Sequence, residues 1–211
     1  MLGKNREKIG PLVRKMGGFL SFLPFTPNQF TFLALPLGGA AAYFLSQQSF
    51  LLGALFVLAA SLVDIFDGSF AHAKDKKSLF GNYWDAMTDR MVEACFYFGL
   101  AFVFPITAFL ALTFSMLISY AKPRVALVIE ADNHDWPAIG ERIDRLLLLI
   151  IGLFIAGLGF WQPLQIVNLT LIAVIVMTSV GFIQRIIYAR KLIEQAKNEG
   201  KVLSYLKDKN N

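Results

Sequence analysis

Long apolar segments constrain the fold of this chain more than any other feature. A helix needs about 20 apolar residues to cross the hydrocarbon core of a bilayer, and most of the chain divides into segments of about this length. Hydrophobic residues make up 56% of its 211 residues, a fraction too high for an ordinary soluble domain. The sequence therefore predicts an all-α integral membrane protein with six transmembrane helices, at residues 27–45, 50–73, 79–103, 107–129, 138–159 and 163–188.

Polar stretches flank these segments at both ends. Between residues 4 and 20, Lys and Arg alternate with apolar residues, a pattern that is typical of an amphipathic helix lying in the membrane interface. The residues after the last segment are rich in charge and predict an extension of the last helix into water. We therefore expect a juxtamembrane amphipathic segment at 1–22, a six-helix transmembrane domain at 23–190 and a cytosolic polar tail at 191–211.

The distribution of charge predicts the orientation. If both termini lie on one side, the three connections on the opposite side, at 46–49, 104–106 and 161–163, contain no Lys, Arg, Asp or Glu. Because Lys and Arg gather on the cytoplasmic side of a membrane, both termini and any polar site are expected to face the cytoplasm, at the cell membrane. The net charge of +5 then reflects topology and contact with anionic membrane lipids rather than binding of nucleic acid.

Four aspartates lie within the second and third predicted helices. Asp64 and Asp67 are three residues apart and Asp85 and Asp89 are four apart, so each pair shares one helix face. The short basic connection at 74–77 makes the two helices neighbours and brings their cytoplasmic halves together. Four carboxylates at membrane depth repel one another and need a positive partner. Hard oxygen ligands suit Mg²⁺, Mn²⁺ or Ca²⁺, and four carboxylates could hold two such ions for a displacement at phosphorus.

Small residues accompany these acids. Gly68 directly follows Asp67, although glycine inside a helix costs about 1 kcal/mol. Its presence permits the close approach of a phosphate or a nucleotide. Ala71 and Gly81 fit the same interpretation, and close packing of helices explains them equally well. The acids and the small residues together predict a cytoplasmic site for metal and phosphate.

The spacing D-x-x-D-G-x-x-A, then nine residues, then G-x-x-x-D-x-x-x-D, runs from Asp64 to Asp89. It resembles the signature of the CDP-alcohol phosphotransferase family. The resemblance implies a homodimeric enzyme that uses Mg²⁺ or Mn²⁺, with two ions, to transfer a phosphatidyl-type group from a CDP-linked lipid to an alcohol, releasing CMP. It also implies that Asp64, Asp67 and Asp85 bind metal. Asp89 would take the proton from the acceptor hydroxyl and also bind metal.

The family usually has Arg after the Ala of this signature, and this chain has His72. Histidine is shorter and mostly neutral at pH 7, so it replaces only part of a charged phosphate contact. The family also begins its first helix with a Pro-Asn-x-x-Thr stretch similar to residues 27–31, where Thr26 and Pro27 in any case make a good helix start. The nucleotide- or CDP-lipid-binding residues that the resemblance implies are Pro27, Asn28, Gln29, Phe30, Thr31, Gly68, Ala71, His72, Ser78 and Gly81.

Basic residues lie in the cytoplasmic halves of the last three predicted helices. Snorkelling to the headgroups could explain Arg145, but Lys122 and Arg124 precede further apolar residues. A cluster of cations facing a cavity predicts an anion site. Because the donor diphosphate would already have metal, a second anion points to a phosphorylated polyol as the acceptor. The acceptor phosphate is expected to bind Ser119, Lys122, Arg124, Arg142 and Arg185.

These positions resemble the subgroup that makes phosphatidylinositol phosphate or archaetidylinositol phosphate from inositol phosphate. Its S-Y-x-K-x-R motif matches residues 119–124 and its Q-R motif matches 184–185, whereas the match at Gly140 and Arg142 is loose. Pro123 departs from the usual Ala and predicts a kink. Inositol phosphate is the expected acceptor, with glycerol 3-phosphate or another alcohol as the alternative. The sequence does not distinguish a diacylglycerol donor from an archaeol donor.

A membrane cation transporter or a non-catalytic membrane scaffold is the alternative of another class. Intramembrane acids also line ion pathways, but a pathway must reach both faces of the membrane. The outer halves of the predicted helices lack Lys, Arg, Asp and Glu, apart from Glu93 near a midpoint. This pattern favours an enzyme whose site opens to one side.

Overall fold

The computed structural model describes residues 24–73, 78–129, 136–137, 139–159 and 162–203. Within these ranges the structure is helical, with a single strand-like bridge between Ile129 and Val202. The predicted all-α architecture is confirmed. The helices are α2 Pro27–Phe32, α3 Ala34–Ser46, α4 Phe50–Ala73, α5 Leu79–Ala101, α6 Pro105–Val125, α7 Arg142–Gly157 and α8 Pro163–Asn198.

A capping box fixes the start of α2. The Thr26 hydroxyl accepts a hydrogen bond from the Gln29 backbone N–H at 3.3 Å, and the Thr26 N–H donates to the Gln29 side chain at 2.9 Å. Pro27 occupies the first turn, where its missing N–H is not needed. The helix therefore begins where the sequence predicted, but the first membrane segment is divided at Leu33 into α2 and α3.

The other boundaries agree with the prediction except near the end of α6 and the start of α7. α7 begins at Arg142 rather than at 138, because Gly140 adopts a positive φ of 74° that is incompatible with a helix. α6 ends at Val125, shortly after Pro123, and a tighter turn follows it to Ile129. α8 continues past its membrane segment to Asn198, as predicted for the start of the polar tail.

Among the described residues, three helical segments are long and apolar enough to cross a membrane: Pro27–Ser46, Pro105–Val125 and Pro163–Asn198. In α4 the apolar part is shorter and spans Phe50–Phe66. The membrane character is thus confirmed, while the count of six spans stays a prediction. The expected interfacial helix within 1–22 lies outside the described residues, as do the last eight residues of the chain.

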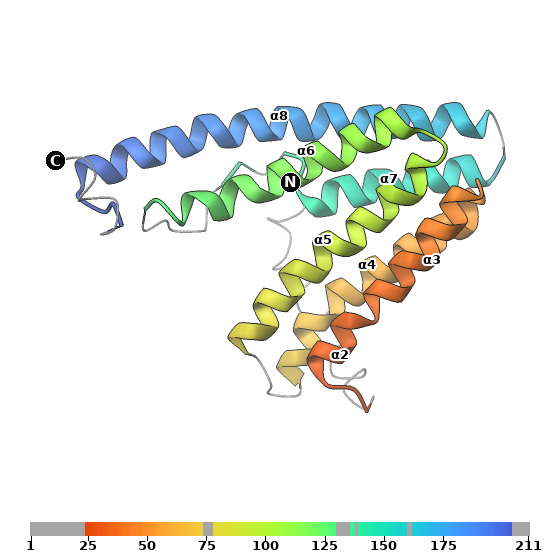
Figure 1. Cartoon of the computed structure of the whole chain (residues 1–211), viewed down its shortest axis with the longest axis horizontal. Coiled ribbons are helices and arrows are strands. Elements are labelled where there is room, and N and C mark those ends of the chain that lie inside the picture. Colours follow the sequence, from red (N-terminus) through yellow and green to blue (C-terminus); the bar gives the residue numbers. More distant parts are fainter. Residues whose placement is uncertain (1–23, 74–77, 130–135, 138, 160–161, 204–211) are drawn as a thin grey trace.

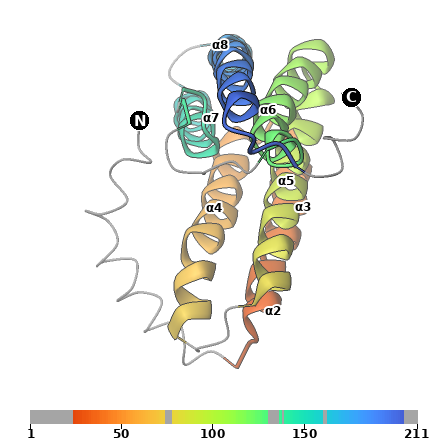
Figure 2. The same cartoon turned by 90° about the vertical axis from the view of Figure 1, so that its left-hand side faces the viewer.

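The helices form a bundle whose long axis follows α8. α6 and α7 pack along α8, and α3 lies against both α4 and α5 (Figures 1 and 2). α4 also packs on α7, and α5 packs on α6. Glycine permits the closest of these approaches, because a side chain at Gly99 would collide with the Ala42 backbone and one at Gly152 would collide with Thr170.

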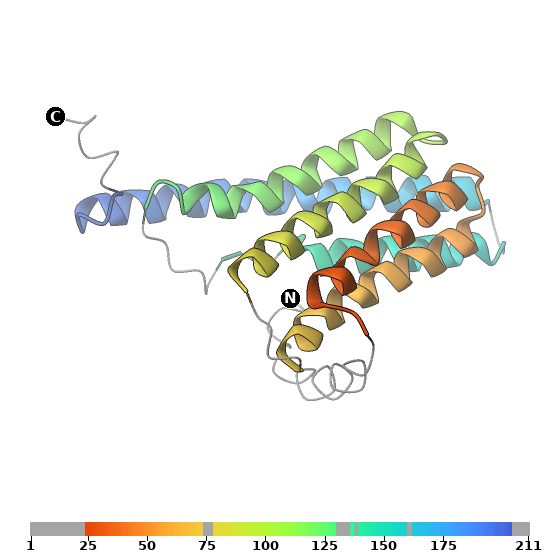
Figure 3. The ribbon, with the colours of Figure 1, turned by 60° about the horizontal axis from the view of Figure 1, so that its bottom comes forward.

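The short helix α2 closes the end of the bundle that carries the aspartates. It packs against both α4 and α5, near the end of α4 and the start of α5 (Figure 3). Phe30 of α2 stacks on Phe70 of α4, with ring centroids 4.5 Å apart. This contact fixes α2 next to the end of α4, the helix that carries Asp64 and Asp67.

Candidate active site

Three of the four aspartates converge. Asp64 of α4 and Asp85 and Asp89 of α5 each offer a carboxylate oxygen, and these oxygens all lie within 4.8 Å of one another. All three side chains are half-buried. Asp67 lies on α4 one turn beyond Asp64, and the placement of its side chain falls outside the described part of the structure.

An arginine from a third helix joins this cluster. The Arg142 Nη1 atom lies 2.6 Å from Asp64 Oδ2 and 2.7 Å from Asp89 Oδ1. The three side chains are 17–22% exposed, so the pairs are largely shielded from water. Arg90 adds a more distant cation, 3.7 Å from Asp89. Two arginines therefore lie against the carboxylates at the junction of α4, α5 and α7.

The donor set fits a hard divalent cation. Asp64, Asp85 and Asp89 supply only carboxylate oxygens, the ligands that Mg²⁺ and Mn²⁺ prefer over the sulfur and imidazole ligands of zinc. The spacing of the oxygens allows one ion to contact all three residues. The residues that would hold a metal are therefore present and already assembled.

The predicted nucleotide segment lies beside the start of α5. The Ser78 hydroxyl caps α5 by accepting a hydrogen bond from the Gly81 N–H at 2.9 Å. A Cβ added at Gly81 would lie 2.9 Å from Ser78 Oγ and 3.4 Å from Asn28 Oδ1. The structure thus brings Asn28, Ser78 and Gly81 together, and Gly81 leaves room that any larger residue would fill.

Local structure already occupies the other residues of the 27–31 stretch. Pro27 and Gln29 belong to the helix start, and the Thr31 hydroxyl donates to the Pro27 carbonyl at 3.2 Å. Phe30 is buried against Phe70. Asn28 is the exposed polar residue of this turn that faces the start of α5.

Gly68, Ala71 and His72 lie on the last turns of α4, and their surroundings fall outside the described part of the chain.

Two of the predicted acceptor residues carry buried, incompletely paired guanidinium groups. Arg185 is 7% exposed, and its Nη1 donates to the Ile118 carbonyl at 2.7 Å. Its Nη2 lies 4.0 Å from Glu141 Oε1. The Nε atoms of both Arg142 and Arg185 are buried without a hydrogen-bond partner among the described residues. Buried donors usually have a partner in the protein, in ordered water or in a ligand, so these two Nε atoms are available to one.

The three predicted acceptor residues of α6 differ in their environments. The Ser119 hydroxyl donates to the Ser115 carbonyl at 2.8 Å and accepts a hydrogen bond from Arg145 Nη2 at 2.9 Å. Its one hydrogen is therefore engaged within the protein. Lys122 is half-buried and Arg124 is exposed in the last turn of α6.

Sequence reasoning missed the partner of Arg145. This side chain is 2% exposed and forms a two-pronged ion pair with Glu93, so its interpretation as a snorkelling residue is wrong. A signal was available, because Glu93 lies one turn beyond Asp89 on α5 and Arg145 one turn beyond Arg142 on α7. Two acids and two arginines at matching spacing predict two stacked pairs.

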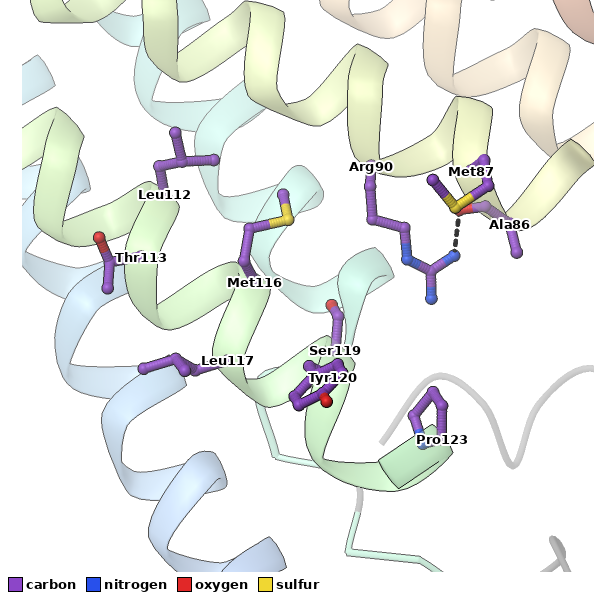
Figure 4. A pocket seen from close by; sticks show the side chains of 10 residues that line it. All are labelled: Ala86, Met87, Arg90, Leu112, Thr113, Met116, Leu117, Ser119, Tyr120 and Pro123. Carbon is purple, nitrogen blue, oxygen red and sulfur yellow. Dashed lines mark hydrogen bonds between the residues drawn. The ribbon is translucent and has the colours of Figure 1, made fainter. Parts of the chain in front are cut away.

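A separate apolar cavity of about 710 Å³ lies between α5 and α6. Arg90 projects toward it from α5, with its Nη1 donating to the Ala86 carbonyl at 2.6 Å (Figure 4). None of the clustered carboxylates lines this cavity. Its lining residues are Ala86, Met87, Arg90, Leu112, Thr113, Met116, Leu117, Ser119, Tyr120 and Pro123.

Comparison with known proteins decides the family. The family model described as CDP-alcohol phosphatidyltransferase matches residues 25–180, a range that includes the aspartates, Arg142 and the α2 cap. The chain belongs to the CDP-alcohol phosphatidyltransferase family. The resemblance noted in the sequence is thereby confirmed. This family member is close to phosphatidylinositol phosphate synthases, as the relatives below indicate.

Curated relatives include enzymes named for inositol phosphate lipids. The archaetidylinositol phosphate synthase of Pyrococcus horikoshii is 30% identical over 199 residues, which cover 92% of this chain and 99% of that protein. The phosphatidylinositol phosphate synthase of Mycobacteroides abscessus is 28% identical over 173 residues, covering 76% and 77% of the two chains. This family member thus spans nearly the whole length of an archaeal relative.

Solved structures share the fold. The phosphatidylinositol phosphate synthase of Mycobacterium tuberculosis with CDP-DAG bound superposes with a TM-score of 0.73 at 23% identity, covering 85% of this chain and 94% of that one. The same enzyme in complex with manganese and citrate gives a TM-score of 0.72 at 24% identity, covering 84% and 88%. At these identities the likeness establishes the architecture of the bundle.

Proposed function

We propose that this family member transfers a phosphatidyl-type group from CDP-diacylglycerol or CDP-archaeol to a phosphorylated polyol and releases CMP. Inositol phosphate is the proposed acceptor. One observation carries the proposal: three carboxylates and an arginine whose buried Nε has no hydrogen-bond partner among the described residues lie at one junction of α4, α5 and α7. A metal site for the donor diphosphate and a cation for a second anion are what this reaction needs.

Asp64, Asp67, Asp85 and Asp89 would hold Mg²⁺ or Mn²⁺, with two ions proposed. When bound, the metal would neutralise the diphosphate and stabilise the oxygen that leaves with CMP. The convergence of Asp64, Asp85 and Asp89 supports this assignment. A related enzyme of the same fold has been solved with manganese, which is compatible with a divalent ion in this chain.

Asp89 is proposed as the general base. Its carboxylate would take the proton of the acceptor hydroxyl, whose oxygen then attacks the β-phosphorus of the CDP-lipid. The bond between the β-phosphorus and the bridging oxygen breaks, and CMP leaves with that oxygen. No covalent intermediate with the protein is required. Support comes from the place of Asp89 in the cluster, within 4.8 Å of the other carboxylate oxygens and 2.7 Å from Arg142.

Arg142 and Arg185 are proposed to bind the phosphate of the acceptor. Each has a buried Nε donor that a phosphate oxygen could complete, and arginine suits phosphate because its donors are planar and paired. Lys122 and Arg124 would add positive charge from the last turn of α6. Ser119 would contribute indirectly, since its hydroxyl is engaged by Ser115 and Arg145.

The nucleotide is proposed to lie against the end of the bundle that α2 closes. Asn28, Ser78 and Gly81 meet there, which supports their assignment. The family resemblance alone assigns Gly68, Ala71 and His72. It also assigns Pro27, Gln29, Phe30 and Thr31, which form the start of α2 and would act by positioning Asn28.

The finer points of topology are proposed as well. The chain would cross the cell membrane six times, with both termini and the site toward the cytoplasm, and would work as a homodimer. Its parts would be a juxtamembrane segment at 1–22, a catalytic transmembrane domain at 23–190 and a cytosolic tail at 191–211. The concentration of charge at one end of the bundle supports this orientation.

Release of CMP tests the proposal. The purified protein in lipid nanodiscs is incubated with CDP-diacylglycerol or CDP-archaeol, Mg²⁺ and either inositol phosphate or glycerol 3-phosphate. We expect CMP with inositol phosphate, a lower kcat/KM with glycerol 3-phosphate, and no turnover in a folded Asp89→Asn variant. Glu194→Gln, on the exposed part of α8, serves as the control with wild-type activity. No CMP with any acceptor would favour a transporter or a scaffold.

A further inference from the structure

A second pair of opposite charges lies deeper in the bundle than the carboxylate cluster. Glu93 of α5 is fully buried, and Arg145 of α7 is 2% exposed. The Arg145 Nε lies 2.5 Å from Glu93 Oε1, and its Nη2 lies 2.7 Å from Glu93 Oε2. Burying two charges removes the hydration of both, so stability alone is a weak explanation for a pair of this kind.

The guanidinium of Arg145 is held from three sides. Besides Glu93, its Nη2 donates to the Ser119 hydroxyl of α6 at 2.9 Å, and its Nη1 donates to the Gly140 carbonyl at 3.0 Å. Gly140 in turn belongs to the turn before α7, where its φ of 74° places it against α8 at Thr178. Arg145 therefore ties α5, α6 and the start of α7 to one point. Four of its five N–H donors are engaged by the protein, so Arg145 is held in place by its neighbours rather than left open to an anion.

The two charged pairs between α5 and α7 are stacked one helical turn apart. Glu93 follows Asp89 by four residues on α5, and Arg145 follows Arg142 by three on α7. α7 packs mainly on α4 and α8, so its link to α5 runs through these long side chains. The deeper pair thereby adds a direct constraint on the rotation and the height of α7 relative to α5, one turn from the place where Arg142 meets Asp89.

We propose that Glu93 and Arg145 are positioning residues that hold Arg142 where it meets the carboxylates and the phosphate of the acceptor. This inference rests on the proposed function and assigns a role to two residues outside the site itself. Neither touches substrate. They act through Arg142, so their loss changes how the acceptor and the metal bind more than how the CDP-lipid binds.

The test removes the pair as a unit. A single substitution leaves one unpaired charge in the membrane interior and is expected to prevent folding. The double variant Glu93→Leu/Arg145→Met replaces both charges with apolar side chains of similar volume and is expected to unfold at a temperature within a few degrees of wild type. Thr107→Val is the matched control, because it removes a hydrogen bond between helices, to Asn168, that does not involve α5 or α7.

We expect the double variant to raise KM for inositol phosphate at least tenfold, with KM for the CDP-lipid changed less than threefold and the control unchanged in both. A merely structural pair would leave the two KM values in their wild-type ratio, and that result in the folded double variant would overturn the proposal.

Binding of Mn²⁺ supplies a second measurement that needs no turnover. If Arg142 is held against Asp64 and Asp89 by the deeper pair, releasing it should lower the Kd for Mn²⁺ at least threefold in the double variant and leave the control unchanged. An unchanged Mn²⁺ affinity contradicts the positioning role even if the protein proves inactive toward every acceptor. A lowered Kd in an inactive protein would uphold the role of the pair and refute the proposed function alone.

Discussion

Under the proposed function, Arg142 would make opposite contributions to metal binding and to turnover. Its guanidinium bridges Asp64 and Asp89, two residues that we assign to the metal. A divalent ion must therefore compete with this cation for the same oxygens. Arg142→Met removes the competitor but also removes a proposed ligand of the acceptor phosphate. We predict that the variant binds Mn²⁺ more tightly and turns over more slowly.

The size of the effect follows from the geometry. Two unit charges 4 Å apart interact by about 4 kcal/mol at the effective dielectric constant of about 20 that suits partly buried sites. When the ion displaces it, Arg142 recovers part of this energy from water, because the three side chains are 17–22% exposed. A net gain of about 1.4 to 2.8 kcal/mol for the ion corresponds to a Kd lowered about 10- to 100-fold.

The assay is a titration of Mn²⁺ into the purified protein, followed by electron paramagnetic resonance of the free ion. Arg190→Met provides the control, since Arg190 is an exposed residue of α8 paired only with Glu194 among the described contacts. Turnover with inositol phosphate is measured on the same samples and should fall at least 100-fold in Arg142→Met. A Kd for Mn²⁺ that is equal to or higher than the wild-type value in the folded variant would refute the competition between arginine and metal.

Three other changes test separate parts of the structure. Asp85→Asn should weaken Mn²⁺ binding at least tenfold without loss of folding, and undiminished affinity would exclude Asp85 from the metal site. Ser78→Ala should lower the free energy of unfolding by about 1 kcal/mol, because α5 loses the hydrogen bond from the Gly81 N–H to its capping hydroxyl. An unchanged denaturation midpoint would contradict that capping role. Gly99→Leu should destabilise the bundle by about 1–3 kcal/mol or prevent its assembly, because the new side chain collides with the Ala42 backbone; a stable variant would show that α3 and α5 are not packed as described.

The sequence predicts most of the helical architecture because local rules determine it. Apolar length locates the membrane segments, and the Thr26 cap with Pro27 places the start of α2 to the residue. The start of α7 was predicted four residues too early, since apolar residues continue through 138–139 while the backbone turns at Gly140. A glycine with positive φ looks like any other glycine in a membrane segment.

The carboxylate cluster was predictable for the same reason, because helix periodicity and a short connection place Asp64 near Asp85 and Asp89. The matching spacing of the acids and the arginines indicated stacked pairs, but the pairing of Glu93 with Arg145 was not recognised, because the two residues are 52 positions apart and meet only through the way α7 rotates against α5. Long-range register of this kind is set by packing of the whole bundle. The contacts of Arg142 with Asp64 and Asp89 likewise depend on how the helices pack.

The central claim is that Asp64, Asp85 and Asp89 bind a divalent cation. Anomalous diffraction from crystals grown with Mn²⁺ tests it most directly, because the signal locates the ion without reference to activity. We expect a peak about 2.2 Å from a carboxylate oxygen of each of the three aspartates, close to the short metal–oxygen distances of such sites, with Arg142 moved away from Asp64. A crystal that binds Mn²⁺ elsewhere, with Arg142 still bridging Asp64 and Asp89, would contradict the account.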